Sequence, residues 1–450
     1  MNTPNRIWLL IPSGRVITLF LAGLCLASLV ADRAEAQIDL DRAPIHYSST
    51  PTNDPVAKLQ QRMDAGEIQL EFDERHGYLL AVLKELDISH RSQMLVFSKT
   101  SFQLRRISPR APRAVYYNDN NYIGWVQNGD VVEISSVDPE KGAIFYTLSQ
   151  QEAEEPKFIR DRGNCLTCHD SSRTQGVPGH LVRSVYTAPS GQPHFGAGTF
   201  NTDQTSPFKE RWGGWYVTGT HGKQRHMGNV VSKDEDHPEE LDVEAGANLV
   251  DLQGRARIGA YLTKHSDIVA LMTLEHQTTM HNLITRANYE TRVVQHDSAV
   301  MNRALQRPAD HESETSRRRV KKVGEKLLEY MLFHNEAALE APIAGTSGFA
   351  EEFAALGPQD SQGRSLRQFD LTRRLFKYPC SYLIYSESFD ALPERVRHQV
   401  YRRLHEVLTG QDQSETFAHL SAEDRQAILE ILRDTKPALA QFWDAQPASL

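Results

Sequence analysis

The sequence predicts an α+β protein with a small antiparallel β-rich N-terminal part, a loop-rich middle segment and a mostly α-helical C-terminal part. Short apolar runs separated by turn residues fill residues 93–148, while Gly, Pro, Ser and Thr are frequent in residues 162–231. Long stretches without Gly or Pro follow residue 266 and favour helices. The composition, with 40% hydrophobic and 24% charged residues, is typical of a globular protein.

The clearest β-hairpin is predicted at Asn128-Gly129. This dipeptide lies between two strand-like runs, and Asn-Gly is a preferred two-residue hairpin turn. A further run follows the turn at Asp138-Pro139. The predicted strands cover residues 93–97, 114–117, 122–127, 130–135 and 143–148.

Helices are expected on both sides of this β-rich part. One helix is predicted over residues 58–86, after an extended segment at residues 37–57. Residues 309–318 are predicted to be a solvated, charged connection. The C-terminal helices are predicted over residues 266–305, 320–339, 366–376, 392–408 and 422–432, the last with Ser421 as its N-cap.

The first 36 residues have the pattern of a secretory signal peptide. Arg6 and Arg15 precede an apolar stretch at residues 16–31, and the tripeptide ending at Ala36 fits the rule for cleavage after that residue. We therefore expect export to the periplasm, with an uncleaved membrane anchor as the alternative. No later apolar run is long enough to cross a bilayer, so no transmembrane span is expected after cleavage.

These patterns divide the chain into four segments. The predicted signal peptide (1–36) is followed by a β-rich N-terminal domain (37–155). A loop-rich segment (156–262) comes next, and a helical C-terminal domain (263–450) completes the chain.

The pentapeptide Cys165-Leu-Thr-Cys168-His169 predicts the covalent attachment of one haem c per chain. In C-x-x-C-H the two thiols form thioethers with the porphyrin vinyl groups, and the adjacent imidazole binds the iron. The composition of this chain gives roughly 0.0014 such matches by chance. Cys165 and Cys168 are therefore the expected attachment points, and His169 is the expected axial ligand.

The remaining cysteines form no second motif. Cys25 lies in the N-terminal apolar run and Cys380 stands alone in the sequence. A closed zinc site usually needs a second C-x-x-C or an H-x-x-x-H pair, and neither is present. A redox dithiol and a structural Cys/His metal site are kept as alternatives to haem.

Met227 follows His169 by 58 residues, in the string His221-Gly-Lys-Gln-Arg-His226-Met227-Gly-Asn229. Together with the C-x-x-C-H motif, this spacing resembles that of the small class I cytochromes c, where an axial methionine follows the motif at a comparable distance. The resemblance covers about residues 160–230 and indicates the c-type cytochrome superfamily. It implies that Met227 is the distal iron ligand.

Other residues could bind the iron at that position. His226 and His221 lie in the same string as Met227. On the predicted helix at residues 266–305, His276 and Met280 are spaced four residues apart and share one face. An iron without a sixth protein ligand is a further possibility.

The expected function is electron transfer by a periplasmic monohaem c-type cytochrome, with a redox partner protein or a small redox mediator. The net charge of −8, or −9 without the first 36 residues, argues against a nucleic-acid partner. The alternatives are a haem enzyme or redox sensor with an exchangeable sixth iron site, and a Cys/His metal-binding structural protein. Dihaem peroxidases of similar size have two C-x-x-C-H motifs and this chain has one, so electron transfer is favoured over peroxidase activity.

Overall fold

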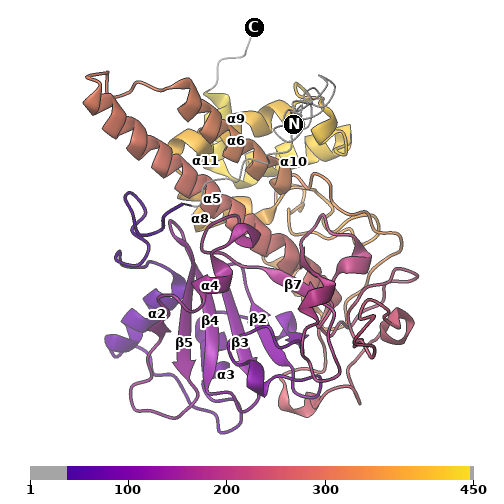
Figure 1. The fold of residues 1–450 in the computed structure, drawn as a ribbon. Helices are drawn as coiled ribbons and strands as arrows, with labels where there is room; N and C mark the ends of the chain where they lie inside the picture. The colour runs from indigo at the N-terminus through magenta and orange to yellow at the C-terminus, as the bar shows by residue number, and fades with distance from the viewer. Residues whose placement is uncertain (1–37, 446–450) are drawn as a thin grey trace, which may run out of the picture. The chain divides into compact units, whose positions relative to one another are not determined.

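An antiparallel sheet in the order β1-β2-β3-β4-β5-β6 forms the N-terminal part of the protein (Figure 1). The computed structural model describes residues 38–445. Asn128 has a φ of 54° in the turn between β3 and β4, a conformation that asparagine tolerates well. The predicted hairpin and the mixed α+β class are thereby confirmed. The strands are β1 Met94–Val96, β2 Arg113–Tyr117, β3 Asn121–Val126, β4 Val131–Asp138, β5 Gly142–Ser149 and β6 Ile159–Arg160.

The long helix α5 (Ile268–Ala304) packs against this sheet, and it matches the predicted helix at residues 266–305. Its first turn is capped by Asp267, whose carboxylate accepts hydrogen bonds from two backbone amides. The Tyr117 hydroxyl donates to the Ala270 carbonyl at 2.8 Å. Farther along, the Tyr289 hydroxyl donates to the Lys141 carbonyl at 2.9 Å. These contacts join the helix to both the second strand and the β4–β5 turn.

The predicted single helix at residues 58–86 is wrong. Two shorter helices occupy this region, α2 (Pro55–Asp64) and α3 (Leu79–Glu85). Gly66 follows α2 with a φ of 73°, which ends the helix in the left-handed region. Asp73 then pairs with Gly77 in a tight backbone bridge, so the chain turns between the two helices.

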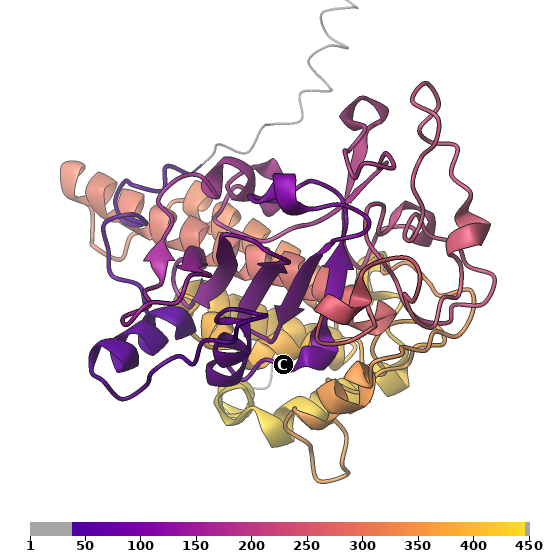
Figure 2. The same cartoon turned by 90° about the horizontal axis from the view of Figure 1, so that it is seen from below.

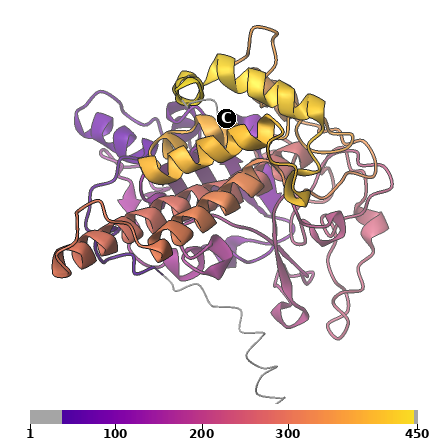
Figure 3. The same cartoon turned by 90° about the horizontal axis from the view of Figure 1, so that it is seen from above.

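The C-terminal part is mostly helical, and α5, α6 and α9 lie side by side when seen from above (Figure 3). The predicted helices at residues 392–408 and 422–432 are confirmed, and Ser421 forms the capping box of α10. The helices after α5 are α6 Glu314–Met331, α7 Phe349–Ala355, α8 Glu387–Asp390, α9 Glu394–Leu408, α10 Ala422–Thr435 and α11 Pro437–Asp444.

Two other helix predictions in this part are wrong. The helix predicted at residues 320–339 begins earlier and ends at Met331, because Phe333 and Asn335 have positive φ values that stop it. The solvated connection predicted to end at residue 318 therefore stops at Ser313, which caps α6. Residues 366–376 form a loop instead of a helix, in which Asp370 accepts two backbone amides and Phe369 bridges to Phe376.

Residues 40–445 belong to one compact unit, which spans the predicted β-rich, loop-rich and helical segments from residue 40 onward. The helix α5 belongs to the predicted C-terminal domain but covers the sheet of the predicted N-terminal domain. The boundaries at residues 155 and 262 remain predictions. The predicted signal peptide and its cleavage after Ala36 lie outside the described residues.

The middle segment is rich in loops, as predicted, and lies beside the sheet (Figure 2). Its regular elements include the one-turn helix α4 (Leu166–His169) and a small antiparallel pair, β7 (Val182–Val185) with β8 (Thr199–Thr202). Between residues 38 and 445, no helix combines the length and apolar character needed to span a membrane.

Candidate haem-attachment site

The C-x-x-C-H motif forms the single turn of α4. The Asp161 carboxylate accepts the backbone amides of Gly163 and Cys165 at 3.0 and 2.9 Å and so fixes the start of this turn. The backbone amide of His169 then donates to the Cys165 carbonyl at 3.0 Å. Residues three apart on a helix lie on one face, so the turn directs the thiols of Cys165 and Cys168 to the same side. Both thiols are free, and that of Cys168 is exposed.

The imidazole of His169 is held in one orientation. Its Nδ1 lies 2.8 Å from the carbonyl oxygen of Gly179, which can only accept, so Nδ1 carries the proton. The ring also packs against Phe145, with 4.8 Å between ring centroids. The Nε2 atom makes no hydrogen bond to the described residues and is not sealed from solvent. This tautomer leaves the Nε2 lone pair available for a metal.

Burial lowers the pKa of His169, with a smaller opposing effect from its hydrogen bond to Gly179. The ring is therefore neutral near pH 7. A neutral imidazole is the form that binds a metal, so both the protonation state and the orientation of the His169 ring suit a metal ligand.

The loop that holds His169 is itself fixed by α5. The side-chain oxygen of Asn282 accepts the backbone amide of His180 at 2.8 Å, and its nitrogen donates to the His180 carbonyl at 2.6 Å. A Cβ atom on Gly179 would lie 2.2 Å from that Asn282 oxygen, so only glycine fits this approach. The acceptor of the His169 ring is thus positioned by the helix behind it.

The environment of Cys165 does not suit a reactive dithiol. Burial and the nearby Asp161 carboxylate raise the pKa of its thiol to about 12. Redox-active C-x-x-C motifs have a lowered thiol pKa instead, because the thiolate is the nucleophile. The dithiol alternative is therefore not favoured by this geometry.

The predicted distal ligands in the loop at residues 221–229 lie in a buried cluster of their own. Met227 is buried against Gly213, and the Ser184 hydroxyl points at its sulfur at 3.6 Å. The rings of His221 and His226 have centroids 4.7 Å apart. Both nitrogens of His221 are hydrogen-bonded, to the Gln224 carbonyl and the Asn248 amide. His226 accepts the Gly228 amide through Nδ1, and its Nε2 is buried without a partner.

The predicted distal ligands on α5 lie in the hydrophobic core. His276 uses both ring nitrogens, with Gln204 at 2.6 Å and Ser381 at 2.7 Å. Its ring stacks on Phe333, with 4.5 Å between centroids. Met280 is fully buried.

The structure thus brings together Cys165, Cys168 and His169, and separately His221, His226 and Met227. Within residues 38–445 it records no hydrogen bond or ring contact between the motif and any predicted distal ligand. The distal assignment remains a prediction. The tryptophans beside this second cluster, Trp212 and Trp215, are buried in the core.

His180 is the neighbour of the motif that sequence reasoning missed. Its ring lies 6.3 Å from Phe145, the ring on which His169 packs, and 4.2 Å from Tyr122. Its Nε2 is 2.7 Å from the Ser135 hydroxyl, and burial lowers its pKa well below the usual value. The only sequence clue is its place directly after Pro178-Gly179, eleven residues beyond His169.

A polar cavity of about 170 Å³ is lined by residues that include Arg173, His180, Thr202 and Thr279, and no residue of the motif lines it. Among the described residues, no group of three or more His, Cys, Asp or Glu side chains is arranged to hold a metal ion. A haem iron needs at most two protein ligands, so this finding does not test the haem hypothesis. Searches of family models, curated proteins and solved structures found no match to the chain.

Proposed function

We propose that this protein is a periplasmic monohaem c-type cytochrome that transfers electrons through a haem bound covalently to Cys165 and Cys168. One observation carries the proposal. The histidine of the C-x-x-C-H motif is neutral near pH 7, donates through Nδ1 to Gly179, and has no hydrogen-bond partner for Nε2 among the described residues. This is the state required of an axial haem ligand.

The residues around the motif have separate roles in this proposal. Cys165 and Cys168 anchor the porphyrin edge, and His169 binds the iron. Gly179 fixes the tautomer of His169, and Asn282 fixes the position of Gly179 through His180. Haem c supplies a one-electron couple whose potential depends on the axial ligands and on burial. The exposed Cys168 keeps one edge of the site at the surface, where a redox partner can approach.

The cellular location and the partner follow from the same proposal. The sequence pattern of residues 1–36 supports export, and thioether attachment of haem c takes place outside the cytoplasmic membrane. The donor and acceptor are a redox protein or a small redox mediator, because the chain offers one haem motif.

A haem protein with an exchangeable sixth site is the second candidate, and one observation favours it. The predicted distal ligands are all engaged or buried elsewhere, with both nitrogens of His221 and of His276 hydrogen-bonded. A small ligand could then bind the iron directly, as in a sensor or a peroxidase-like enzyme.

The first experiment is the absorption spectrum of the mature protein, expressed with its signal sequence and a haem-maturation system. We expect one covalent haem by pyridine haemochrome. A low-spin spectrum in both oxidation states supports the carrier, and a high-spin state that binds cyanide quickly supports the second candidate. A folded, colourless product would contradict both.

Alkylation of the denatured protein gives an independent count of thioethers. If both motif thiols carry the porphyrin, iodoacetamide labels only Cys380 among Cys165, Cys168 and Cys380. Labelling of all three would show that no thioether has formed. The matched control is Cys380→Ser, which should leave the haem content unchanged because Cys380 is buried in the hydrophobic core and is not part of the motif.

A further inference from the structure

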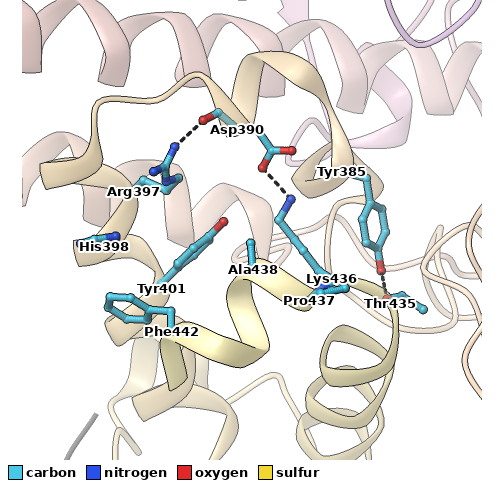
Figure 4. A pocket seen from close by; sticks show the side chains of 10 residues that line it. All are labelled: Tyr385, Asp390, Arg397, His398, Tyr401, Thr435, Lys436, Pro437, Ala438 and Phe442. Atoms are coloured by element: carbon cyan, nitrogen blue, oxygen red, sulfur yellow. Dashed lines mark hydrogen bonds and ion pairs between the residues drawn. The ribbon is translucent and has the colours of Figure 1, made fainter. Parts of the chain in front are cut away.

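A cavity of about 470 Å³ lies among the C-terminal helices (Figure 4). It is lined by the α8–α9 region on one side and by the start of α11 on the other. Its size lies within the range of roughly 300–1,000 Å³ that small-molecule sites span. The haem proposal makes no use of it.

Arg397 brings a positive charge to this cavity that no described carboxylate matches. Its Nη1 donates to the main-chain carbonyls of Asp390 at 2.5 Å and Leu392 at 3.4 Å. Within residues 38–445 the structure records no ion pair for this guanidinium. Among the described residues its Nε and Nη2 hydrogens have no acceptor, and this pair is the fork that binds oxyanions in a bidentate manner.

Tyr401 adds a hydrogen-bond donor. The residue is 3% exposed, and its hydroxyl has no hydrogen-bond partner among the described residues. In Figure 4 the hydroxyl points into the space between Arg397 and Lys436. Burial and the Asp390 carboxylate raise the pKa of Tyr401 to about 12, so the hydroxyl stays protonated at neutral pH.

The start of α11 faces the same cavity. Ala438 lines it, and the structure records no acceptor for its backbone amide within the described residues. The N-terminus of a helix carries a partial positive charge that favours anions. Lys436 is 2.7 Å from the Asp390 carboxylate, so these two charges offset each other and the positive charge of Arg397 remains.

We propose that this cavity binds a small organic anion, with one carboxylate or phosphate group on an apolar body. The oxyanion would lie against Arg397, the Tyr401 hydroxyl and the Ala438 amide. Phe442 and Tyr385 provide aromatic walls for the apolar body. An inorganic ion alone would leave these walls without a contact, and an uncharged ligand would leave Arg397 unmatched.

Calorimetric titration of the complete chain without the predicted signal peptide tests this site. The probes are benzoate and phenyl phosphate, with inorganic phosphate and benzyl alcohol for comparison. We expect one of the two aromatic anions to bind more tightly than either comparison compound, and the preferred one identifies the head group. Equal affinity for benzyl alcohol, or no binding of either aromatic anion, would overturn the proposal.

Variants separate the site from general charge effects. Arg397→Gln should weaken binding of the preferred anion by about tenfold or more, because a charge-assisted bidentate contact is lost. Tyr401→Phe removes one hydroxyl, keeps the ring, and should weaken binding by about three- to tenfold. The control is Arg433→Gln, which removes the same charge from a residue that pairs with Asp444 and does not line the cavity. If the control weakens binding as much as Arg397→Gln does, the cavity is not the site.

Discussion

The side chain of Asn282 makes two hydrogen bonds to the backbone of His180. Its oxygen accepts the His180 amide at 2.8 Å, and its nitrogen donates to the His180 carbonyl at 2.6 Å. All of these polar groups are buried. The pair connects α5 to the loop whose Gly179 carbonyl orients His169. A residue distant in sequence thereby controls the geometry of the proposed iron ligand.

Asn282→Ala should lower the free energy of unfolding by about 3 kcal/mol, because two buried backbone groups lose their partners at roughly 1–3 kcal/mol each. It should also alter the spectrum of the haem-loaded protein, since the acceptor of His169 can shift. Denaturant titration and absorption spectroscopy measure the two effects.

The control is Asn302→Ala, also on α5 and buried, whose side chain donates to the carbonyls of Ala309 and His311. It should lower stability without changing the spectrum. Identical spectra for wild type and Asn282→Ala would contradict a positioning role for Asn282.

Met227→Ala tests the distal ligand. The comparison variant is Met280→Ala. Because Met227 and Met280 are both buried, each alanine variant should lower the free energy of unfolding by about 2–5 kcal/mol through the cavity it leaves. If Met227 binds the iron, only its variant also changes the reduced spectrum and lowers the reduction potential. Identical spectra for the two variants would show that Met227 is not the distal iron ligand. A spectral change in His276→Ala would then direct attention to α5.

Glu336 should make the stability depend on pH. Burial raises the pKa of this carboxyl to about 7 from an ordinary value of 4.5. The folded state therefore binds its proton more tightly than the unfolded state does. The contribution of Glu336 to the free energy of unfolding is present below pH 4.5 and is lost as the pH rises to 7.

Glu336→Gln removes this titration. The unfolding free energy of the variant, relative to wild type, should rise between pH 4.5 and pH 7, as measured by urea titration at several pH values. Glu340→Gln, an exposed carboxylate four residues away, is the control. A parallel pH profile for wild type and Glu336→Gln would show that this carboxyl does not titrate as expected.

The capping box of α10 gives a prediction independent of any cofactor. The Ser421 hydroxyl accepts the Asp424 amide at 3.0 Å. Ser421→Ala should cost about 1 kcal/mol of stability, because one backbone donor of the first turn loses its partner. Ser421→Asn keeps an oxygen acceptor and should stay close to wild type in thermal unfolding. A loss as large for asparagine as for alanine would argue against the cap.

The parts of the fold that local chemistry determines could be predicted from the sequence. Asn128 prefers the left-handed conformation of its turn, and no Gly or Pro interrupts residues 268–304, so the hairpin and α5 were expected. The prediction of one helix over residues 58–86 is wrong because the chain turns at the bridge between Asp73 and Gly77, and the pattern of apolar residues does not reveal this turn. The loop at residues 366–376 is stabilised by Asp370, whose side chain competes with helical hydrogen bonds.

The same distinction applies to the site. Cys165, Cys168 and His169 are neighbours in sequence, so a local motif is enough to propose haem attachment at these residues. His180 and Asn282 contact each other across 102 residues, and no local pattern predicts such a pair. The distal ligand depends on a contact of the same long-range kind.

On the proposed function, the order in which the chain is exported gives the packing of α5 a further consequence. A chain exported from its N-terminal end brings Asn282 across the membrane 113 residues after His169, so the motif is accessible before the helix that fixes its loop can pack against it. Loops lacking their packing partners are mobile, and a maturation enzyme needs access to both thiols. On the proposed function, haem attachment has its best opportunity in this interval. Packing of α5 would then fix the orientation of His169 after the haem iron is already bound.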